Sequence, residues 1–242
     1  MVRAVFFDMG GTLDGDGLHW LDRFVDLYAR AGLDEPREVI RAAFDAAERR
    51  AGADEQIQSA ALDRMVDCHV QWQFDEMRRR GVTFGGRAAD TLKSDIVNAF
   101  VEPVRNAAIA NRLVLESLHA KGLALGVVSN GCGNVQSLCD DLGYSPWLSL
   151  VIDSRVAGLF KPDPALFRHA CERMHLPPSS IIMVGDSFDR DIRPARAIGM
   201  KTAWLQGRSD RPCPDPSLVD ITLRTLADLP GELAEKEARD VA

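Results

Sequence analysis

Short apolar runs recur along the chain and predict the strands of a sheet. The first covers residues 4–7 and combines β-branched and aromatic side chains. Similar runs lie at residues 125–128, 150–152, 181–184 and 201–205, and a short segment of residues 221–223 follows them. Continuous apolar runs of this length are typical of strands that are buried on both faces. Helical patterns separate the later runs, so we expect an α/β fold with a doubly wound, Rossmann-like parallel sheet.

The segment after the first run has a helical pattern and almost no strand pattern. Apolar spacing predicts one helix over residues 21–28 and a second that starts near Pro36. Apolar residues from Ile57 to Trp72 then step by three and four positions, which predicts a long amphipathic helix that ends near Gly81.

The chain is expected to return to the sheet at Glu102-Pro103. A helix from about Gly86 to Phe100 comes before this point, and a helix over residues 113–120 follows it. At the other end of the chain, the residues after the last apolar run predict a polar tail.

The length of 242 residues allows one large domain or two unequal ones. We predict an α/β core domain of residues 1–13 and 106–242, with an inserted all-helical domain of residues 14–105. Hydrophobic residues at 46% and charged residues at 27% are typical of globular proteins and argue against a disordered or fibrous chain.

Charge and cysteine content narrow the class further. The formal net charge of −7 gives no indication of a nucleic-acid partner. The five cysteines are odd in number and form no CxxC pair, which predicts reduced thiols and no zinc site. The first strand begins by residue 4 without a leader pattern, and no apolar stretch reaches the roughly 18 residues of a membrane span. We therefore expect a cytoplasmic protein with no membrane partner.

The first apolar run stops at Asp8, which two glycines and a threonine follow closely. Gly10 and Gly11 let the backbone turn sharply and approach a ligand, and Thr12 adds a hydroxyl at the same place. A carboxylate at the carboxyl end of a central strand is well placed for covalent catalysis. On these residues alone, an ordinary turn after a strand is the simpler interpretation.

Three later loops bring further polar residues to the same edge of the predicted sheet. Ser129 ends the second run, Lys161 lies in a loop, and Asp186 and Asp191 follow the fourth run. With Asp8 they comprise a nucleophile, a hydroxyl donor, a cation and an acidic pair. Phosphoryl transfer has a use for each of them, and Mg²⁺ needs only a few hard oxygen ligands from the protein. The set therefore favours Mg²⁺-dependent phosphoryl transfer.

Four motifs in this order resemble those of the haloacid dehalogenase superfamily of hydrolases. They are FFDMGGTL, VVSNG, KPDP and VGDSFDRD. Each motif is weak alone, but all four at successive loops are specific. The resemblance covers residues 1–13 and about 106–225, and the segment between the first two motifs resembles the helical cap of the phosphatase branch. It implies a Mg²⁺-dependent hydrolase for a small phosphorylated metabolite.

The resemblance also implies a role for individual residues. Asp8 would be the nucleophile that forms an aspartyl-phosphate, Ser129 would bind a phosphoryl oxygen, and Lys161 would balance the negative charge. The implied Mg²⁺ ligands are Asp8, the carbonyl of Gly10, Asp186 and Asp191, the last directly or through a water. The residues that we expect to contact the substrate are Thr12, Asn130 and Gly131.

Gly10 departs from the pattern of the family's phosphatases. In those enzymes the residue two positions after the nucleophile is a second aspartate, which protonates the leaving group and then activates water. General acid–base catalysis is typically worth about 10² to 10⁴ in rate. The phosphatase interpretation therefore requires Asp14 or Asp16 to supply the proton, or a leaving group that needs none.

Three other interpretations accommodate Gly10. A non-catalytic or weakly active binding protein with the same fold ranks second. The family's 2-haloacid dehalogenases also lack the second aspartate, but they do not need the metal site that Asp186 indicates. Phosphonate hydrolases use a cap lysine as a Schiff base, and residues 13–92 contain no lysine. We rank these two activities last.

The helical cap is expected to select the leaving group. His19, Trp20 and Arg23 follow the first motif and could contact a substrate. We favour the alternative in which Trp20 packs in the helical core and the other two side chains are solvated. The expected partner is a small phosphorylated substrate, and we allow for a homodimer.

Overall fold

The computed structural model describes residues 1–84 and 88–241 and has a six-stranded parallel sheet at its centre. The strand order is β3-β2-β1-β4-β5-β6. The strands are β1 Ala4–Phe7, β2 Ala124–Ser129, β3 Leu148–Asp153, β4 Ile181–Gly185, β5 Lys201–Leu205 and β6 Ile221–Leu223. Every apolar run predicted as a strand is one, and the doubly wound sheet is confirmed.

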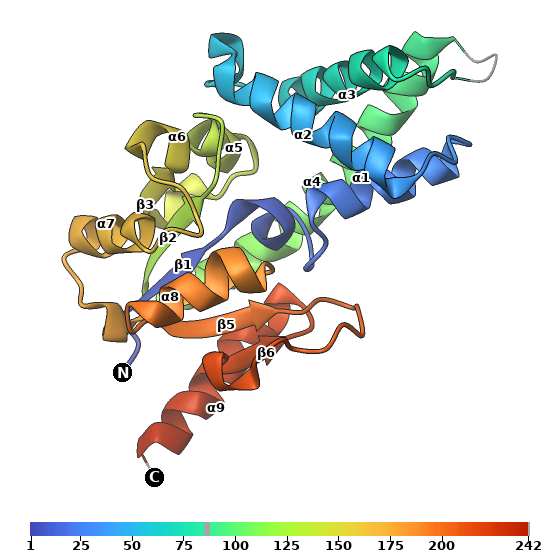
Figure 1. Ribbon diagram of the computed structural model, residues 1–242. Coiled ribbons are helices and arrows are strands. Elements are labelled where there is room, and N and C mark those ends of the chain that lie inside the picture. The colour runs from blue at the N-terminus through green and yellow to red at the C-terminus, as the bar shows by residue number, and fades with distance from the viewer. Residues whose placement is uncertain (85–87, 242) are drawn as a thin grey trace.

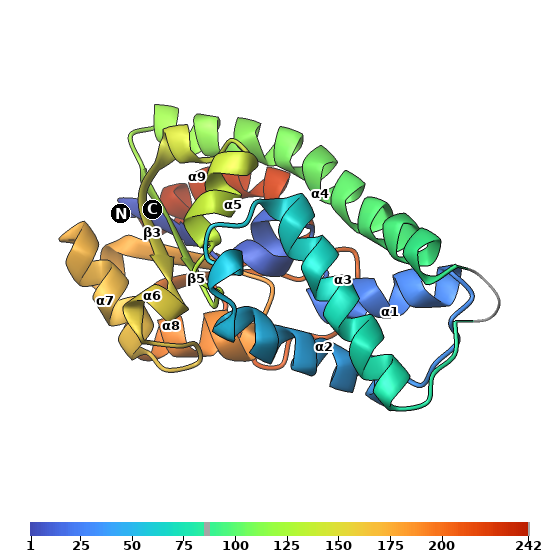
Figure 2. The same ribbon diagram turned by 90° about the horizontal axis from the view of Figure 1, so that it is seen from above.

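Helices cover both faces of the sheet (Figure 2). They are α4 Ala89–Ala120, α5 Val135–Asp141, α6 Ser154–Ala157, α7 Ala165–Met174, α8 Arg193–Ala197 and α9 Leu229–Val241. Successive side chains of a strand point to opposite faces. Val5 and Phe7 of β1 accordingly join the hydrophobic core under α4, α5 and α9, whereas Ala4 and Phe6 join the core under α7 and α8.

A second group of helices stands beyond the sheet, and α4 extends from this group to the core (Figure 1). It consists of α1 Trp20–Arg30, α2 Arg37–Ala53, α3 Leu62–Arg79 and the first part of α4. Its centre is aromatic, since Phe24 stacks on Phe100 at a ring-centroid distance of 4.8 Å and on His69 at 5.5 Å. No described helix combines the length and the apolar character needed to cross a membrane.

The expected break at Glu102-Pro103 is wrong. Helix α4 continues through Pro103 to Ala120, so the two helices predicted on either side of the proline are one element, and the expected start near Gly86 lies outside the described residues. A proline inside a helix removes one backbone hydrogen bond. Phe100 and Val104 on either side of it are fully buried, and this packing holds the helix together. The predicted domain boundary after residue 105 therefore falls inside one helix, and the division into two domains stays a prediction.

Two other elements differ from expectation. Ile57 belongs to a short 3₁₀ turn, Glu55–Ile57, and the long helix α3 begins later, at Leu62. The expected polar tail is helix α9, because Leu229 and Leu233 pack on the core. The five cysteines are free, in agreement with the expected reduced thiols.

Candidate active site

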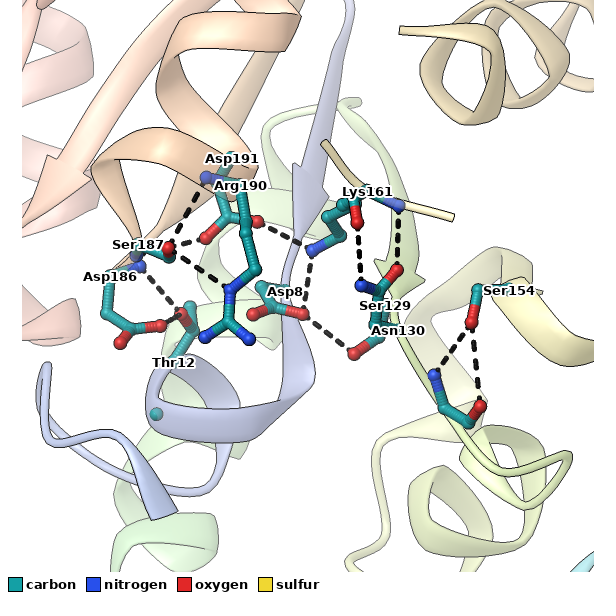
Figure 3. Close-up of polar contacts among 12 residues, drawn as sticks. Asp8, Thr12, Ser129, Asn130, Ser154, Lys161, Asp186, Ser187, Arg190 and Asp191 are labelled. Carbon is teal, nitrogen blue, oxygen red and sulfur yellow. Dashed lines mark hydrogen bonds and ion pairs between the residues drawn. The ribbon is translucent and has the colours of Figure 1, made fainter. Parts of the chain in front are cut away.

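The polar residues predicted at the edge of the sheet lie together (Figure 3). Asp8 follows β1, Ser129 ends β2, and Asp186 and Asp191 follow β4. Lys161 reaches the same place from the loop between α6 and α7. The carboxyl ends of adjacent parallel strands meet at one edge of the sheet, and this explains why distant sequence segments converge here.

Asp8 lies between a hydroxyl and an ammonium group. Ser129 Oγ donates to Asp8 Oδ1 at 2.7 Å, and Lys161 Nζ lies 2.9 Å from the same oxygen. Lys161 Nζ also donates to Asp191 Oδ1 at 2.6 Å, so one buried lysine bridges two carboxylates. The structure thus brings together the three residues that the sequence predicted as catalytic.

The environment keeps both Asp8 and Lys161 charged. Burial raises the pKa of Asp8, but the charge of Lys161 and the hydrogen bonds from Lys161 and Ser129 outweigh burial and lower it. Burial lowers the pKa of Lys161, but the charges of Asp191 and Asp8 outweigh burial and raise it above its ordinary value. Asp8 is therefore an ionised carboxylate, the form that a nucleophile needs.

Asp8, Asp186 and Asp191 bring one carboxylate oxygen each to within 4.8 Å of the others. Burial, and then the charges of Asp191 and Asp8, raise the pKa of Asp186 to about 8. Burial and the charge of Asp8 raise the pKa of Asp191 to about 6, although Lys161 opposes this. The cluster has more buried negative charge than one lysine balances, and its hard oxygen donors are those that Mg²⁺ prefers. The residues present therefore fit a divalent cation.

Thr12 holds Asp186 of this cluster in place through hydrogen bonds. Its side chain is fully buried, its hydroxyl donates to Asp186 Oδ1 at 3.3 Å, and it accepts from the backbone N–H of Asp186 at 3.1 Å. Thr12 is not part of the cavity wall. The structure thus assigns Thr12 to the positioning of Asp186, in contrast to the expected substrate contact.

Asn130 and Gly131 do line the cavity, but their polar groups are already engaged. The Asn130 amide donates to the carbonyl of Lys161 at 3.0 Å and accepts from its backbone N–H at 2.8 Å. The N–H of Gly131 donates to Ser154 Oγ at 3.1 Å. Asn130 therefore fixes the loop of Lys161, and substrate contact by either residue stays a prediction.

Asp14 occupies the corner of the cavity next to Gly10. It accepts hydrogen bonds from the backbone N–H of Gly11 at 2.6 Å and from the indole N–H of Trp20. Arg23 Nη2 lies 3.8 Å from the Asp14 carboxylate and donates to its carbonyl at 3.2 Å. Burial, and to a smaller extent the charge of Asp8, raise the pKa of Asp14, although Arg23 opposes this. Asp16, the other candidate proton donor, is exposed and does not line the cavity.

The cavity above Asp8 has a volume of about 290 Å³ and lies between the sheet edge and the second helical group. The α/β core and the loop after β1 supply one wall, and helices α1, α2 and α3 supply the other. The lining residues are Asp8, Met9, Gly10, Asp14, His19, Trp20, Phe44, Asp45, Glu48, Met65, Ser129, Asn130, Gly131, Cys132, Asn134, Val135, Leu138, Lys161 and Arg190. This volume suits a small metabolite.

Several lining residues were not foreseen from the sequence. Trp20 and half-buried His19 line the cavity, in line with the alternative that they meet a substrate. Arg23 is buried against Asp14, so the expectation that it is solvated is wrong. Arg190 lies within the fourth motif, between two aspartates, and this position could have identified it as a residue of the site. Glu48 of α2 had no such signal, because only the packing of α2 against the core brings it to the cavity.

Comparisons with known proteins agree with this geometry. The sequence profile of haloacid dehalogenase-like hydrolases matches residues 2–199. The chain is 27% identical over 192 residues to glyceraldehyde 3-phosphate phosphatase of Methanocaldococcus jannaschii, covering 70% of this chain and 84% of that protein. It is 35% identical over 116 residues to phosphoserine phosphatase of Thermus thermophilus, covering 48% of this chain and 46% of that protein.

A solved structure of a dehalogenase in an intermediate complex shares the fold. Its TM-score is 0.63 at 17% sequence identity, and the match covers 94% of this chain and 95% of that one. At this identity the likeness concerns the fold alone.

Proposed function

The chain belongs to the haloacid dehalogenase-like hydrolase family, and from that membership we propose that it is a Mg²⁺-dependent phosphatase of a small phosphorylated metabolite. The observation that carries the proposal is the placement of an ionised, buried Asp8 beside Lys161 and beside the carboxylates of Asp186 and Asp191. The relatives described as phosphatases support the same substrate class.

In the first step, a carboxylate oxygen of Asp8 attacks the phosphorus of the monoester. A bond forms between Asp8 and phosphorus, the bond from phosphorus to the leaving oxygen breaks, and its electron pair leaves with that oxygen. Lys161 and Ser129 hold Asp8 in place and offer donors to the phosphoryl oxygens. Water then hydrolyses the aspartyl-phosphate, which releases phosphate and regenerates Asp8.

Asp14 is the residue that we propose as the proton carrier in place of the missing second aspartate. It lines the same cavity as Asp8, and its raised pKa increases its protonated fraction near neutral pH. Trp20 and Gly11 each donate one hydrogen bond to it, so its direction is fixed while lone pairs on both oxygens stay free. A protonated Asp14 can donate to the leaving oxygen and, once ionised, accept a proton from water.

The proposed Mg²⁺ ligands are Asp8, Asp186, Asp191 and the carbonyl of Gly10. When bound, Mg²⁺ neutralises charge on the phosphoryl oxygens. Thr12 and the backbone N–H groups around Asp186 keep the acidic cluster in place without it.

The decisive experiment is a hydrolysis screen with and without Mg²⁺ across alkyl phosphates, aryl phosphates and 2-haloacids. We expect Mg²⁺-dependent release of phosphate and no release of halide. Halide release without metal would instead establish a dehalogenase.

A binding protein without turnover is the second candidate, and Gly10 is the observation that favours it. A phosphonate hydrolase is disfavoured, because Lys161 is the only lysine among the described residues that line the cavity and it is bridged between Asp8 and Asp191.

A further inference from the structure

The charged side chains around the cavity are divided unevenly between its two walls. The α/β core and the loop after β1 contribute both signs, with Asp8 and Asp14 beside Lys161 and Arg190, whereas helix α2 contributes only the acidic residues Asp45 and Glu48. Residues three positions apart lie on the same face of a helix, so these two carboxylates are neighbours. Among the described residues, the second helical group places no lysine or arginine on the cavity wall.

Glu48 is held in its direction by a relay of buried polar side chains. His69 Nε2 lies 2.8 Å from Glu48 Oε1, and Gln73 Nε2 lies 2.8 Å from His69 Nδ1. An amide N–H of Gln73 pointing at Nδ1 places the ring proton on Nε2, from which it is donated to Glu48. Among the described residues, no hydrogen bond engages Glu48 Oε2, which is available to a ligand.

His69 and Gln73 are both fully buried, and His69 is enclosed by aromatic rings. The ring of Phe24 stacks on it at 5.5 Å, and Phe44 lies 5.1 Å away. Burial of polar groups is unfavourable unless hydrogen bonds compensate it. Both ring nitrogens of His69 have partners here, whereas Gln73 Oε1 has none among the described residues. His69 and Gln73 are therefore positioning residues for Glu48.

The side chain of Asp45 has no hydrogen-bond or ion-pair partner within residues 1–84 and 88–241. The Glu48 side chain is 43% exposed at the mouth of the cavity, so burial raises its pKa only in part, and the hydrogen bond from His69, together with the charge of Arg190, holds the pKa below its ordinary value. Glu48 is therefore ionised at neutral pH. A ligand in the α2 half of the cavity therefore meets the carboxylates of Asp45 and Glu48. Glu48 Oε2 and the Asp45 carboxylate are available to accept hydrogen bonds from it.

The phosphoryl group occupies the opposite half if the proposed function is correct. Lys161 supplies positive charge there, and a divalent cation held by Asp8, Asp186 and Asp191 would add to it. Arg190 acts electrostatically on both Asp186 and Glu48, whereas the negative charge of α2 lies where the leaving group must sit. An anionic leaving group would be repelled by α2, whereas a cationic one complements it.

We propose that the preferred substrates are small phosphate monoesters whose leaving group carries a primary ammonium group, and this inference rests on the proposed function. Glu48 and Asp45 bind the ammonium group. Glu48 is then the residue that determines specificity. The cavity of about 290 Å³ accommodates a small phosphate monoester of this kind.

Three esters of matched length test this inference: 2-aminoethyl phosphate, 2-hydroxyethyl phosphate and phosphoglycolate. They place an ammonium, a hydroxyl and a carboxylate at the same position. We expect kcat/KM for the ammonium ester to exceed that for the hydroxyl ester by about 10- to 100-fold, the range of a hydrogen bond to a charged group. The carboxylate ester should be the poorest of the three.

Glu48→Gln keeps the shape of the side chain and removes its charge. We expect the preference for the ammonium ester over the hydroxyl ester to fall at least several-fold in this variant, with Asp45 accounting for the preference that remains. Glu38→Gln is the matched control, because Glu38 lies on the same helix, is exposed and does not line the cavity. This variant should keep the wild-type preference. A wild-type protein that turns over the hydroxyl or carboxylate ester as well as the ammonium ester overturns the inference.

Binding to the Mg²⁺-loaded Asp8→Asn protein separates this inference from the proposed function. Calorimetry with the same esters should give a lower Kd for the ammonium ester, and Glu48→Gln in this background should reduce the difference at least several-fold. If the wild-type protein turns over none of the esters, the proposed phosphatase function is contradicted. The order of the Kd values of the three esters still tests the role of Glu48 in that case. Equal Kd values for the ammonium and hydroxyl esters overturn that role.

Discussion

A Cβ atom on Gly10 would lie 3.8 Å from the indole Nε1 of Trp20, at an ordinary contact distance. The backbone of Gly10 has φ −71° and ψ 119°, a conformation open to any residue. The same indole N–H donates to Asp14, so Asp14 lies beside the place that a side chain at position 10 would enter. The loop therefore lacks the second aspartate, although its backbone and surroundings would accommodate an aspartate at position 10.

Gly10→Asp should fold and should raise the turnover of alkyl phosphates. A carboxylic acid at this position adds the family's proton carrier beside Asp14, so we expect kcat for alkyl phosphates to rise, but by less than the roughly 10² to 10⁴ of a full general acid because Asp14 already serves as one. Aryl phosphates should gain less, because their leaving oxygen needs little protonation. Steady-state kinetics with both ester types measures the effect.

Gly11→Asp is the matched control for this variant. Gly11 has φ +81°, and a Cβ atom there would lie 2.8 Å from the Asp186 carboxyl carbon. Both the backbone conformation and the contact oppose a side chain. This variant should lose thermal stability and Mg²⁺ binding. If both variants were equally stable, the conclusion that the loop admits a side chain at position 10 but not at position 11 would be contradicted.

The sheet and its catalytic edge were predictable because both depend on local sequence. Each strand is a short apolar run, and Asp8, Ser129 and Asp186 stand at or directly after the ends of such runs. In parallel sheets this position alone brings them together. The continuity of α4 was not predictable, since burial of Phe100 and Val104 overrides the local effect of Pro103.

The substrate-facing wall was also out of reach of sequence reasoning. Glu48 and His69 lie on different helices, and their hydrogen bond depends on how α2 packs on α3. Thr12 was expected at the substrate because it is near Asp8 in sequence, but its hydroxyl is engaged by Asp186. Distance along the chain does not determine which side of a loop a side chain occupies.

Asp8→Asn should abolish turnover of every phosphate ester while leaving the fold intact. The amide is a poor nucleophile, and it retains one oxygen that can accept from Ser129 and Lys161. We expect at least about a 10³-fold loss of kcat, with an unchanged far-UV circular dichroism spectrum. Substantial turnover by the folded variant would exclude Asp8 as the nucleophile.

Mg²⁺ should stabilise the protein more at high pH than at low pH. The pKa of Asp186 is raised to about 8 in the folded chain from an ordinary value of 3.8. The folded state then binds more protons than the unfolded state between these two values, so the stability of the metal-free protein falls as pH rises through this window. Bound Mg²⁺ favours the ionised carboxylates and opposes this fall.

Thermal unfolding with and without Mg²⁺ at about pH 5.5 and about pH 8.5 measures this difference. The Tm increase caused by Mg²⁺ should be larger at the higher pH, and Asp186→Asn should remove most of it. The same Tm increase at both pH values would contradict a cation that binds to this cluster.

Asp14→Asn should slow the hydrolysis of alkyl phosphates far more than that of aryl phosphates. Asparagine keeps an oxygen that can accept from the Gly11 N–H, but it cannot transfer a proton, so we expect a loss of about 10² to 10⁴ for alkyl esters. Asp16→Asn is the control, since Asp16 is exposed outside the cavity, and it should retain wild-type rates. A plot of log kcat/KM against leaving-group pKa should be steeper for Asp14→Asn than for the wild type. Parallel lines with equal loss for both ester types would instead assign Asp14 a structural role through Trp20 and Gly11, and unchanged alkyl turnover would show that the proton comes from another group.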